Sequence, residues 1–151
     1  MPRVEDHGDV DPILADALAN GDTAAALARV LLARLLLPVV AAGERAADGH
    51  ERSAEMSVPL LVDAAGSRAL PVFTGLEPLR RWRPAARPVP MPGARLIAGA
   101  VSEGYDAVVV DVAGPHPLQL TGPVLHRLAE AATRLQAGEA AGVSVVAQPR
   151  G

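Results

Sequence analysis

The sequence predicts an α/β (α+β) domain in which helices pack on a mixed β-sheet of about five strands. Apolar residues recur at the helical spacing in several segments, and short runs rich in valine and leucine lie between them, bounded by turn residues. The resulting order α-α-β-β-β-α-β-α-β-β-α mixes both kinds of element along the chain. A length of 151 residues fits one domain, which we expect at 11–135 between flexible tails at 1–10 and 136–151.

Two helices are predicted at the start of this domain. Asp11 and Pro12 fit the N-cap and first position of the first helix, and the turn residues at 20–21 fit its end. Asp22 or Thr23 fits the N-cap of the second helix. Both helices present apolar residues on one side, so we expect them to pack on the sheet.

Strands are predicted in the next part of the chain. The apolar run Leu35–Val40 predicts a strand buried on both faces, although Pro38 favours a bulge or an edge position. Residues 41–55 are polar and small, which predicts a mobile loop. The strands Ser57–Val62 and Ala69–Phe73 are separated by turn residues, so we expect a hairpin.

Thr74 and Glu77 match the capping-box pattern T-x-x-E, which predicts a short helix after the hairpin. Leu76, Leu79 and Trp82 share one face of that helix. Trp82 is the only tryptophan in a chain with one Phe and one Tyr, so we expect its ring in the core. The residues expected to be structural here are Phe73, Thr74, Leu76, Leu79 and Trp82.

The second half begins with a proline-rich passage at 84–92, which is predicted to be extended and to include a strand near 89–91. A helix near 96–101, closed by Gly104, and a strong strand at 107–112 follow. Residues 117–120 are predicted to pair with that strand. Thr121 fits the cap of the last helix, which ends near Leu135, and 143–146 fit a short strand or a docking tail.

Composition excludes several chemistries. The chain has no cysteine and no lysine, which removes disulfides, thiolate sites, P-loop lysines and Schiff-base lysines. No histidine pair has the helical spacing of a zinc motif, so we expect no metal and no cofactor. A loop site built on His50 with neighbouring carboxylates is less favoured than a solvated loop. The net charge of −3 and the short apolar runs argue against nucleic-acid and membrane partners.

Five arginines form the one uneven charge feature, because no acidic residue lies between Glu77 and Glu103. Their guanidinium groups suit a phosphate, a carboxylate or an acidic protein surface. Together with Trp82 they also suit single-stranded nucleic acid. The alternative, which we favour, is that Trp82 packs in the core while the arginines are solvated. The residues are Arg80, Arg81, Arg83, Arg87 and Arg95.

Asp111 and His116 provide a second candidate site. Both follow the predicted strand at 107–112, and strand ends are where α/β proteins place active residues. One interpretation is that the two residues form an acid–base pair. The favoured alternative is that His116 is a surface residue in a turn between two prolines.

The segment 69–76 (ALPVFTGL), followed by Leu79, Trp82, Pro84 and the run 86–90 (ARPVP), resembles the amino-terminal domain of the SseB family (enhanced serine sensitivity protein). The segments 36–40, 55–56 and 120–123 extend the resemblance, which runs from about Asp11 to Leu135. The form it resembles is the actinobacterial single-domain one. The resemblance implies an α/β fold and a cytoplasmic bacterial protein, and it implies no catalytic residue.

We therefore expect a non-enzymatic domain that binds a protein partner, through a sheet edge or through the arginine-bearing segment. One alternative is a small ligand-binding domain or enzyme that uses Asp111 and His116. The other is a nucleic-acid or ribosome-associated factor that uses the arginines between Arg80 and Arg95.

Overall fold

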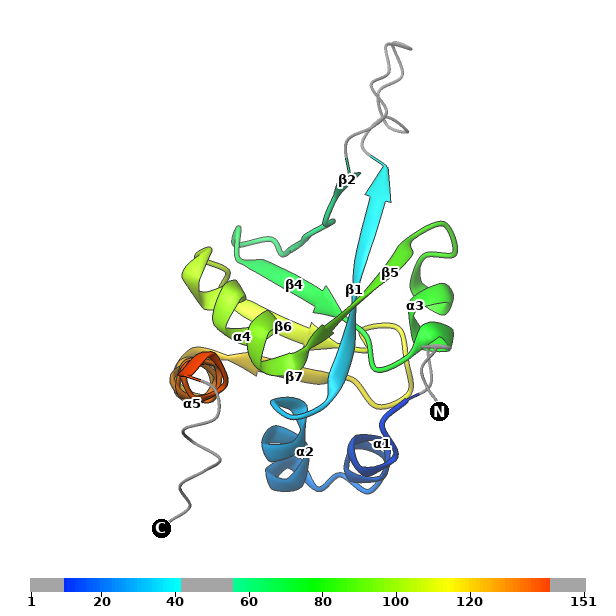
Figure 1. The fold of residues 1–151 in the computed structure, drawn as a ribbon. Coiled ribbons are helices and arrows are strands. Elements are labelled where there is room, and N and C mark those ends of the chain that lie inside the picture. Colours follow the sequence, from blue (N-terminus) through cyan, green and yellow to red (C-terminus); the bar gives the residue numbers. More distant parts are fainter. Residues whose placement is uncertain (1–9, 42–55, 142–151) are drawn as a thin grey trace.

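Helices and strands alternate along the chain and form two sheets with helices around them (Figure 1). The structure is a computed structural model that describes residues 10–41 and 56–141. Its helices are α1 (Pro12–Ala19), α2 (Thr23–Val30), α3 (Leu76–Trp82), α4 (Gly93–Ser102) and α5 (Gly122–Ala141). Its strands are β1 (Arg34–Ala41), β2 (Met56–Ser57), β3 (Leu61–Val62), β4 (Arg68–Val72), β5 (Arg87–Pro92), β6 (Ala107–Val110) and β7 (Leu118–Thr121). The predicted mixed α/β class is confirmed.

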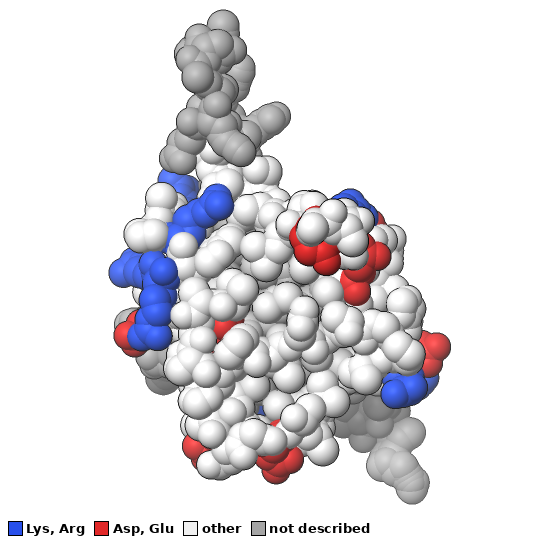
Figure 2. Space-filling view, turned by 180° about the vertical axis from the view of Figure 1, so that it is seen from behind, with Lys and Arg blue, Asp and Glu red and all other residues white. Residues whose placement is uncertain are grey.

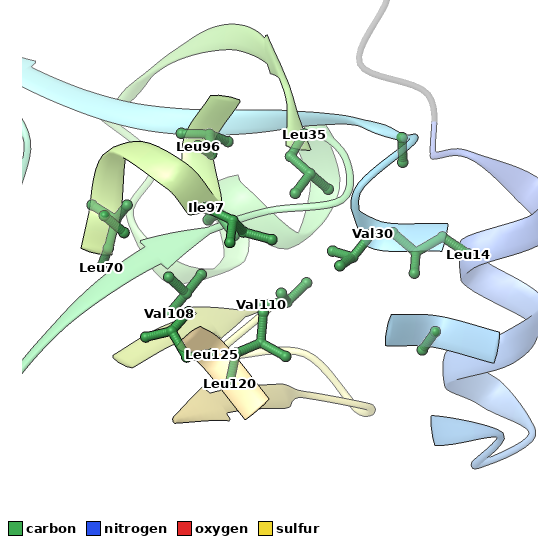
Figure 3. Close-up of a cluster of buried hydrophobic side chains, with 14 of the residues drawn as sticks. Leu14, Val30, Leu35, Leu70, Leu96, Ile97, Val108, Val110, Leu120 and Leu125 are labelled. Carbon is green, nitrogen blue, oxygen red and sulfur yellow. The ribbon is translucent and has the colours of Figure 1, made fainter. Parts of the chain in front are cut away.

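The four-stranded sheet has the order β3-β4-β6-β7. It is mixed, because β4 and β6 run parallel whereas β3 and β7 are antiparallel to their neighbours. One face carries the row Leu70, Val108 and Leu120, which the strand register places side by side. These side chains are buried against Ile97 of α4 and Leu125 of α5 (Figure 3). Strand alternation and helix periodicity therefore supply the two sides of one apolar core.

The three-stranded sheet has the order β2-β1-β5, with both pairings antiparallel. It is joined to the larger sheet through Leu36 of β1 and Phe73, which directly follows β4. The N–H of Leu36 donates to the carbonyl of Phe73 at 2.8 Å, and the N–H of Phe73 donates to the carbonyl of Leu36 at 2.9 Å. This bridge fixes the middle of β1 beside the end of β4.

The prolines of β5 all lie at positions where a backbone N–H would not bond to β1, so the N–H that proline lacks is not missed in the sheet. Because Leu36 bonds to Phe73, its pairing with Pro90 is a non-hydrogen-bonded one, and antiparallel alternation gives Pro88 and Pro92 the same status. Their nitrogens point away from β1, toward the outer edge of this sheet. Pro38, which faces Pro88, also has its nitrogen turned away from β5. It therefore lies on a stretch of β1 that has no paired neighbour on this side, between Phe73 and β2, which is locally the predicted edge position and not a bulge.

Helix α4 begins against the end of α2. The N–H of Gly93 donates to the carbonyl of Ala33 at 2.8 Å, and the N–H of Ala94 donates to the carbonyl of Leu31 at 3.2 Å. The free N–H groups at the start of α4 thus bond to free carbonyls just beyond the end of α2. The dipoles of the two helices attract each other in this arrangement. A Cβ on Gly93 would lie 1.8 Å from the carbonyl oxygen of Val30, so only glycine allows this approach.

Several predicted boundaries need correction. Asp11 and Asp22 cap α1 and α2 as predicted, by accepting the N–H of Ile13 and of Ala25. The segment 57–62 is wrong as one strand, because β2 pairs with β1 and only β3 pairs with β4. The last helix continues past 136 to the end of α5. Ala41 belongs to β1, and the rest of the predicted loop, the His50 site and the segment 143–146 lie outside the described residues.

Candidate functional site

Four of the five candidate arginines lie together on the surface. Arg80 and Arg81 are exposed on α3, Arg83 ends that helix, and Arg87 begins β5. Figure 2 shows basic side chains gathered along one side of the molecule, where Figure 1 places α3 and the start of β5. We call these four residues the arginine surface. Arg95 is separate: it lies on α4 and lines a hollow with Leu31 and Leu32, which follow α2, and with Leu135 of α5.

The arginine surface has one acidic neighbour on its own helix. Glu77 accepts from Arg81 across one helical turn at 3.1 Å, and both side chains are largely exposed. An exposed pair of this kind is weak, about 0.3–0.5 kcal/mol. Three guanidinium groups of the surface, those of Arg80, Arg83 and Arg87, have no acidic partner among the ion pairs found in the described residues. The surface is therefore a local excess of positive charge on a chain that is acidic overall.

Trp82 holds α3 against the body of the molecule. Its ring centroid lies 5.4 Å from that of Phe73, which is fully buried, and the guanidinium of Arg83 lies 4.9 Å from the Trp82 ring. Leu79 is also fully buried, and Leu76 packs against the same cluster. The ring thus contacts both Phe73 and Arg83, and these contacts compete with stacking on a nucleic-acid base.

Asp111 is a buried carboxylate at the end of β6. Its Oδ1 accepts the N–H of Thr74 at 2.8 Å, and its Oδ2 accepts the Thr74 hydroxyl at 2.7 Å. Thr74 follows the parallel strand β4, so the pair ties the carboxyl ends of the two parallel strands together. The predicted capping box is therefore wrong: Gly75 is the N-cap of α3, and the Thr74 side chain serves Asp111. Asp111 also has a φ of 56°, which ends β6 at Val110 instead of 112.

The pKa of Asp111 is raised above its ordinary value, because burial disfavours the charged carboxylate more than the two Thr74 hydrogen bonds stabilise it. A raised pKa in the folded state stabilises the fold when the group is protonated. That contribution is complete below the pKa of the unfolded chain, and it is lost as the pH rises through the folded pKa.

We expect Asp111→Asn to remove this pH dependence while keeping the local structure. The amide oxygen can accept from the Thr74 N–H, the amide nitrogen can donate to the Thr74 hydroxyl, and asparagine tolerates a positive φ. Urea unfolding of both proteins between about pH 7 and about pH 4 measures the effect. The stability of the wild type relative to the variant should increase toward acid pH. A relative stability that increases toward neutral pH would contradict this assignment.

His116 lies in a different environment from Asp111. It is exposed and lines a hollow with residues of α1 and of the turn into α2, among them Leu18, Gly21 and Asp22. Both oxygens of Asp111 are bonded to Thr74, and no hydrogen bond or ion pair to His116 is found in the described part of the chain. The two residues of the second candidate site therefore contact different parts of the molecule.

A hollow on the outer face of the four-stranded sheet was not predicted from the sequence. It has a volume of about 590 Å³ and is open to solvent. The register places Leu61, Ala69, Ala107 and Thr121 in one row across this face, and all four line the hollow. The two alanines are small and lower the floor between larger side chains on β3 and β7. The signal in the sequence is the alternation of the outward Ala69 and Ala107 with larger inward residues. It can be recognised only once the pairing of the strands is known.

Neither a membrane span nor a metal cluster is found in the ranges 10–41 and 56–141. No helix there is long and apolar enough to cross a bilayer, and no group of three His, Asp or Glu residues could hold an ion. Among known proteins, the family model of the SseB protein N-terminal domain matches residues 11–127. No curated protein and no solved structure matches the chain.

Proposed function

Since this chain belongs to the SseB family, and since the resemblance implies no catalytic residue, we propose that it is a non-enzymatic protein-interaction module. It binds an acidic surface of a partner through the arginine surface. The observation that carries the proposal is the gathering of four exposed guanidinium groups, from Arg80 to Arg87, of which one has an acidic partner among the described residues. Arginine binds carboxylates with two parallel hydrogen bonds, which gives both affinity and orientation.

The arginine surface is better supported than a sheet edge as the binding element. Strand addition needs a row of N–H donors and carbonyl acceptors on the open side of an edge strand. On β5, the longest edge strand, the outward positions are Pro88, Pro90 and Pro92, which have no N–H to donate. The other edge strands, β2, β3 and β7, are at most four residues long.

Packing also favours a protein partner over nucleic acid. Trp82 packs against Phe73 and lies beside the guanidinium of Arg83, so a base that stacked on the ring would have to displace one of these contacts. The net charge of −3 opposes binding to a polyanion away from the arginine surface. For the small-ligand or enzyme alternative, the contacts of Asp111 and His116 supply no shared site.

Binding of a fluorescent glutamate-rich peptide tests the proposed function. The test protein carries Arg80→Glu and Arg87→Glu, and the control carries Arg127→Glu and Arg134→Glu, which change two exposed arginines of α5 by the same charge. We expect the dissociation constant to rise at least about tenfold in the test protein, since lost charge-assisted contacts are each worth more than about 1 kcal/mol. The control should stay within about twofold of the wild type.

Two results would overturn the proposed function. Equal losses in the test and control proteins would mean that net charge, and not the arginine surface, governs binding. Tighter binding of an oligo-dT strand than of the peptide, with a steep salt dependence, would favour the nucleic-acid alternative.

We place this module in the bacterial cytoplasm, in an actinobacterial member of the family. The support is compositional: the chain lacks lysine and cysteine and has 14 glycines and 14 prolines, as expected of a GC-rich genome and compatible with a reducing compartment. Fractionation of cells that produce the tagged protein checks the location.

A further inference from the structure

The hollow on the outer face of the four-stranded sheet has chemically different ends. Asp63 and Asp106 line one end, at the β3–β4 turn and just before β6. Glu103, at the C-terminal end of α4, lies close by, because Arg68 donates to the carbonyls of Glu103 and Gly104 while its own N–H donates to Asp106. We call Asp63, Glu103 and Asp106 the acidic rim. All three are exposed, and Arg68 is the one basic residue among the described ones that is hydrogen-bonded there.

The other end of the hollow lies beyond the end of β6, on the side of the molecule where Figure 1 shows α3. Val112 lines this end and packs against the cluster that also holds Leu76 and Trp82 of α3. The floor between the two ends is formed by Ala107 and Val109, which are apolar. Figure 2 shows the result: basic side chains on one side, acidic ones at the upper opposite side, and an almost uncharged surface between them.

This arrangement is complementary to itself. A two-fold axis through the middle of an apolar surface brings the basic end of one copy over the acidic end of the other, and the reverse contact forms at the same time. The apolar floors then face each other across the interface. A surface of one sign, or one without an apolar centre, would not pair with itself in this way.

We infer that the acidic partner of the arginine surface is a second copy of this chain, bound face to face across the hollow. The inference rests on the proposed function, because it names the partner that the arginine surface binds. In this pair, Arg80 and Arg87 of each copy meet the acidic rim of the other, and Thr121 and Gln119 lie near the axis. Charge complementarity decides in favour of a second copy, since the chain carries both halves of the contact.

Reciprocal charge exchange tests the pair by light scattering and sedimentation velocity of the full chain from micromolar to millimolar concentration. The basic-end variant is Arg80→Glu with Arg87→Glu, and the acidic-end variant is Asp63→Arg with Glu103→Arg. Each should raise the dimer dissociation constant at least about tenfold by placing like charges opposite each other. An equimolar mixture of the two should form a heterodimer of near wild-type affinity, because each altered end then meets its opposite.

Further variants separate loss of contact from loss of folding. Gln119→Arg places like charges near the axis and should also weaken the dimer, whereas Arg127→Glu with Arg134→Glu on α5 should leave it unchanged. Circular dichroism and melting temperature check that every variant folds, which matters for Asp63 because it accepts the N–H of Ala65 and of Ser67 in its turn. Failure of the mixture to associate, with both variants folded, overturns the pair.

The inference and the proposed function fail in different ways. A wild-type protein that is monomeric at every concentration, but still binds the glutamate-rich peptide through Arg80 and Arg87, overturns the second copy as partner and leaves the arginine surface as a binding site. A monomer that also binds the peptide no better than the arginine-surface variant overturns both.

Discussion

Gly93→Ala should destabilise the domain by at least about 3 kcal/mol, which is the upper range for a forced overpacking of a closed site. The new Cβ would lie 1.8 Å from the carbonyl oxygen of Val30, and that oxygen belongs to the backbone, so no side-chain rotation relieves the clash. Relief would separate α4 from the end of α2 and lengthen the bonds from Gly93 and Ala94 to the carbonyls beyond it. The melting temperature should fall by about 6–12 °C for a chain of this size.

Gly99→Ala in the same helix is the matched control. A Cβ at Gly99 meets nothing within 4 Å, and the residue is exposed in the interior of α4. Alanine should therefore stabilise the protein, by about 0.5–1 kcal/mol, through helix propensity alone. Opposite shifts of the two midpoints in thermal and urea unfolding support the close approach at Gly93. Shifts of the same sign would mean that helix propensity governs both sites.

Trp82→Ala should cost about 3 kcal/mol, at the lower end of the range for removing a large aromatic side chain, because the ring is partly exposed. The loss comes from the contact with the buried ring of Phe73 and from the cover that Trp82 gives to the α3 cluster. Trp82→Phe keeps most of that contact and should cost about 1 kcal/mol. The native emission of Trp82, the only tryptophan, should be blue-shifted relative to the unfolded chain.

A melting temperature of Trp82→Ala equal to that of the wild type would show that the ring contributes little to packing. In that case a role for Trp82 in binding, together with Arg83, would have to be reconsidered. Changing Arg83 to Met separates the two explanations, because it removes the cation above the ring and keeps an unbranched side chain.

Features that depend on neighbours in sequence were predictable, whereas those that depend on strand pairing were not. The caps at Asp11 and Asp22 follow from side chains that reach their own helix. The exposure of Arg80 and Arg81 follows from their separation from the apolar face of α3. Thr74 shows the limit, because its hydroxyl had a local partner in the capping-box pattern and a distant one in Asp111, and the distant one is bonded.

The hollow shows the same limit on a larger scale. Its row Leu61, Ala69, Ala107 and Thr121 comes from four strands, and nothing in the order of residues tells which of them become neighbours. The crossing of β4 to β6 encloses α3, β5 and α4, and β5 departs to the second sheet instead of lying between them. Sequence patterns located most of the strands but did not assign them to two sheets.

The prolines of β5 also bear on what happens before folding is complete. In a partly folded chain in which β5 has paired with β1, the free side of β5 offers carbonyls but no N–H at Pro88, Pro90 and Pro92, so a strand from another chain cannot complete a ladder there. This edge therefore protects the chain against aggregation, because no strand of another molecule can extend the sheet in that direction. At this edge, copies of the chain can associate only through contacts between side chains. Such contacts can form a closed oligomer with a defined number of copies.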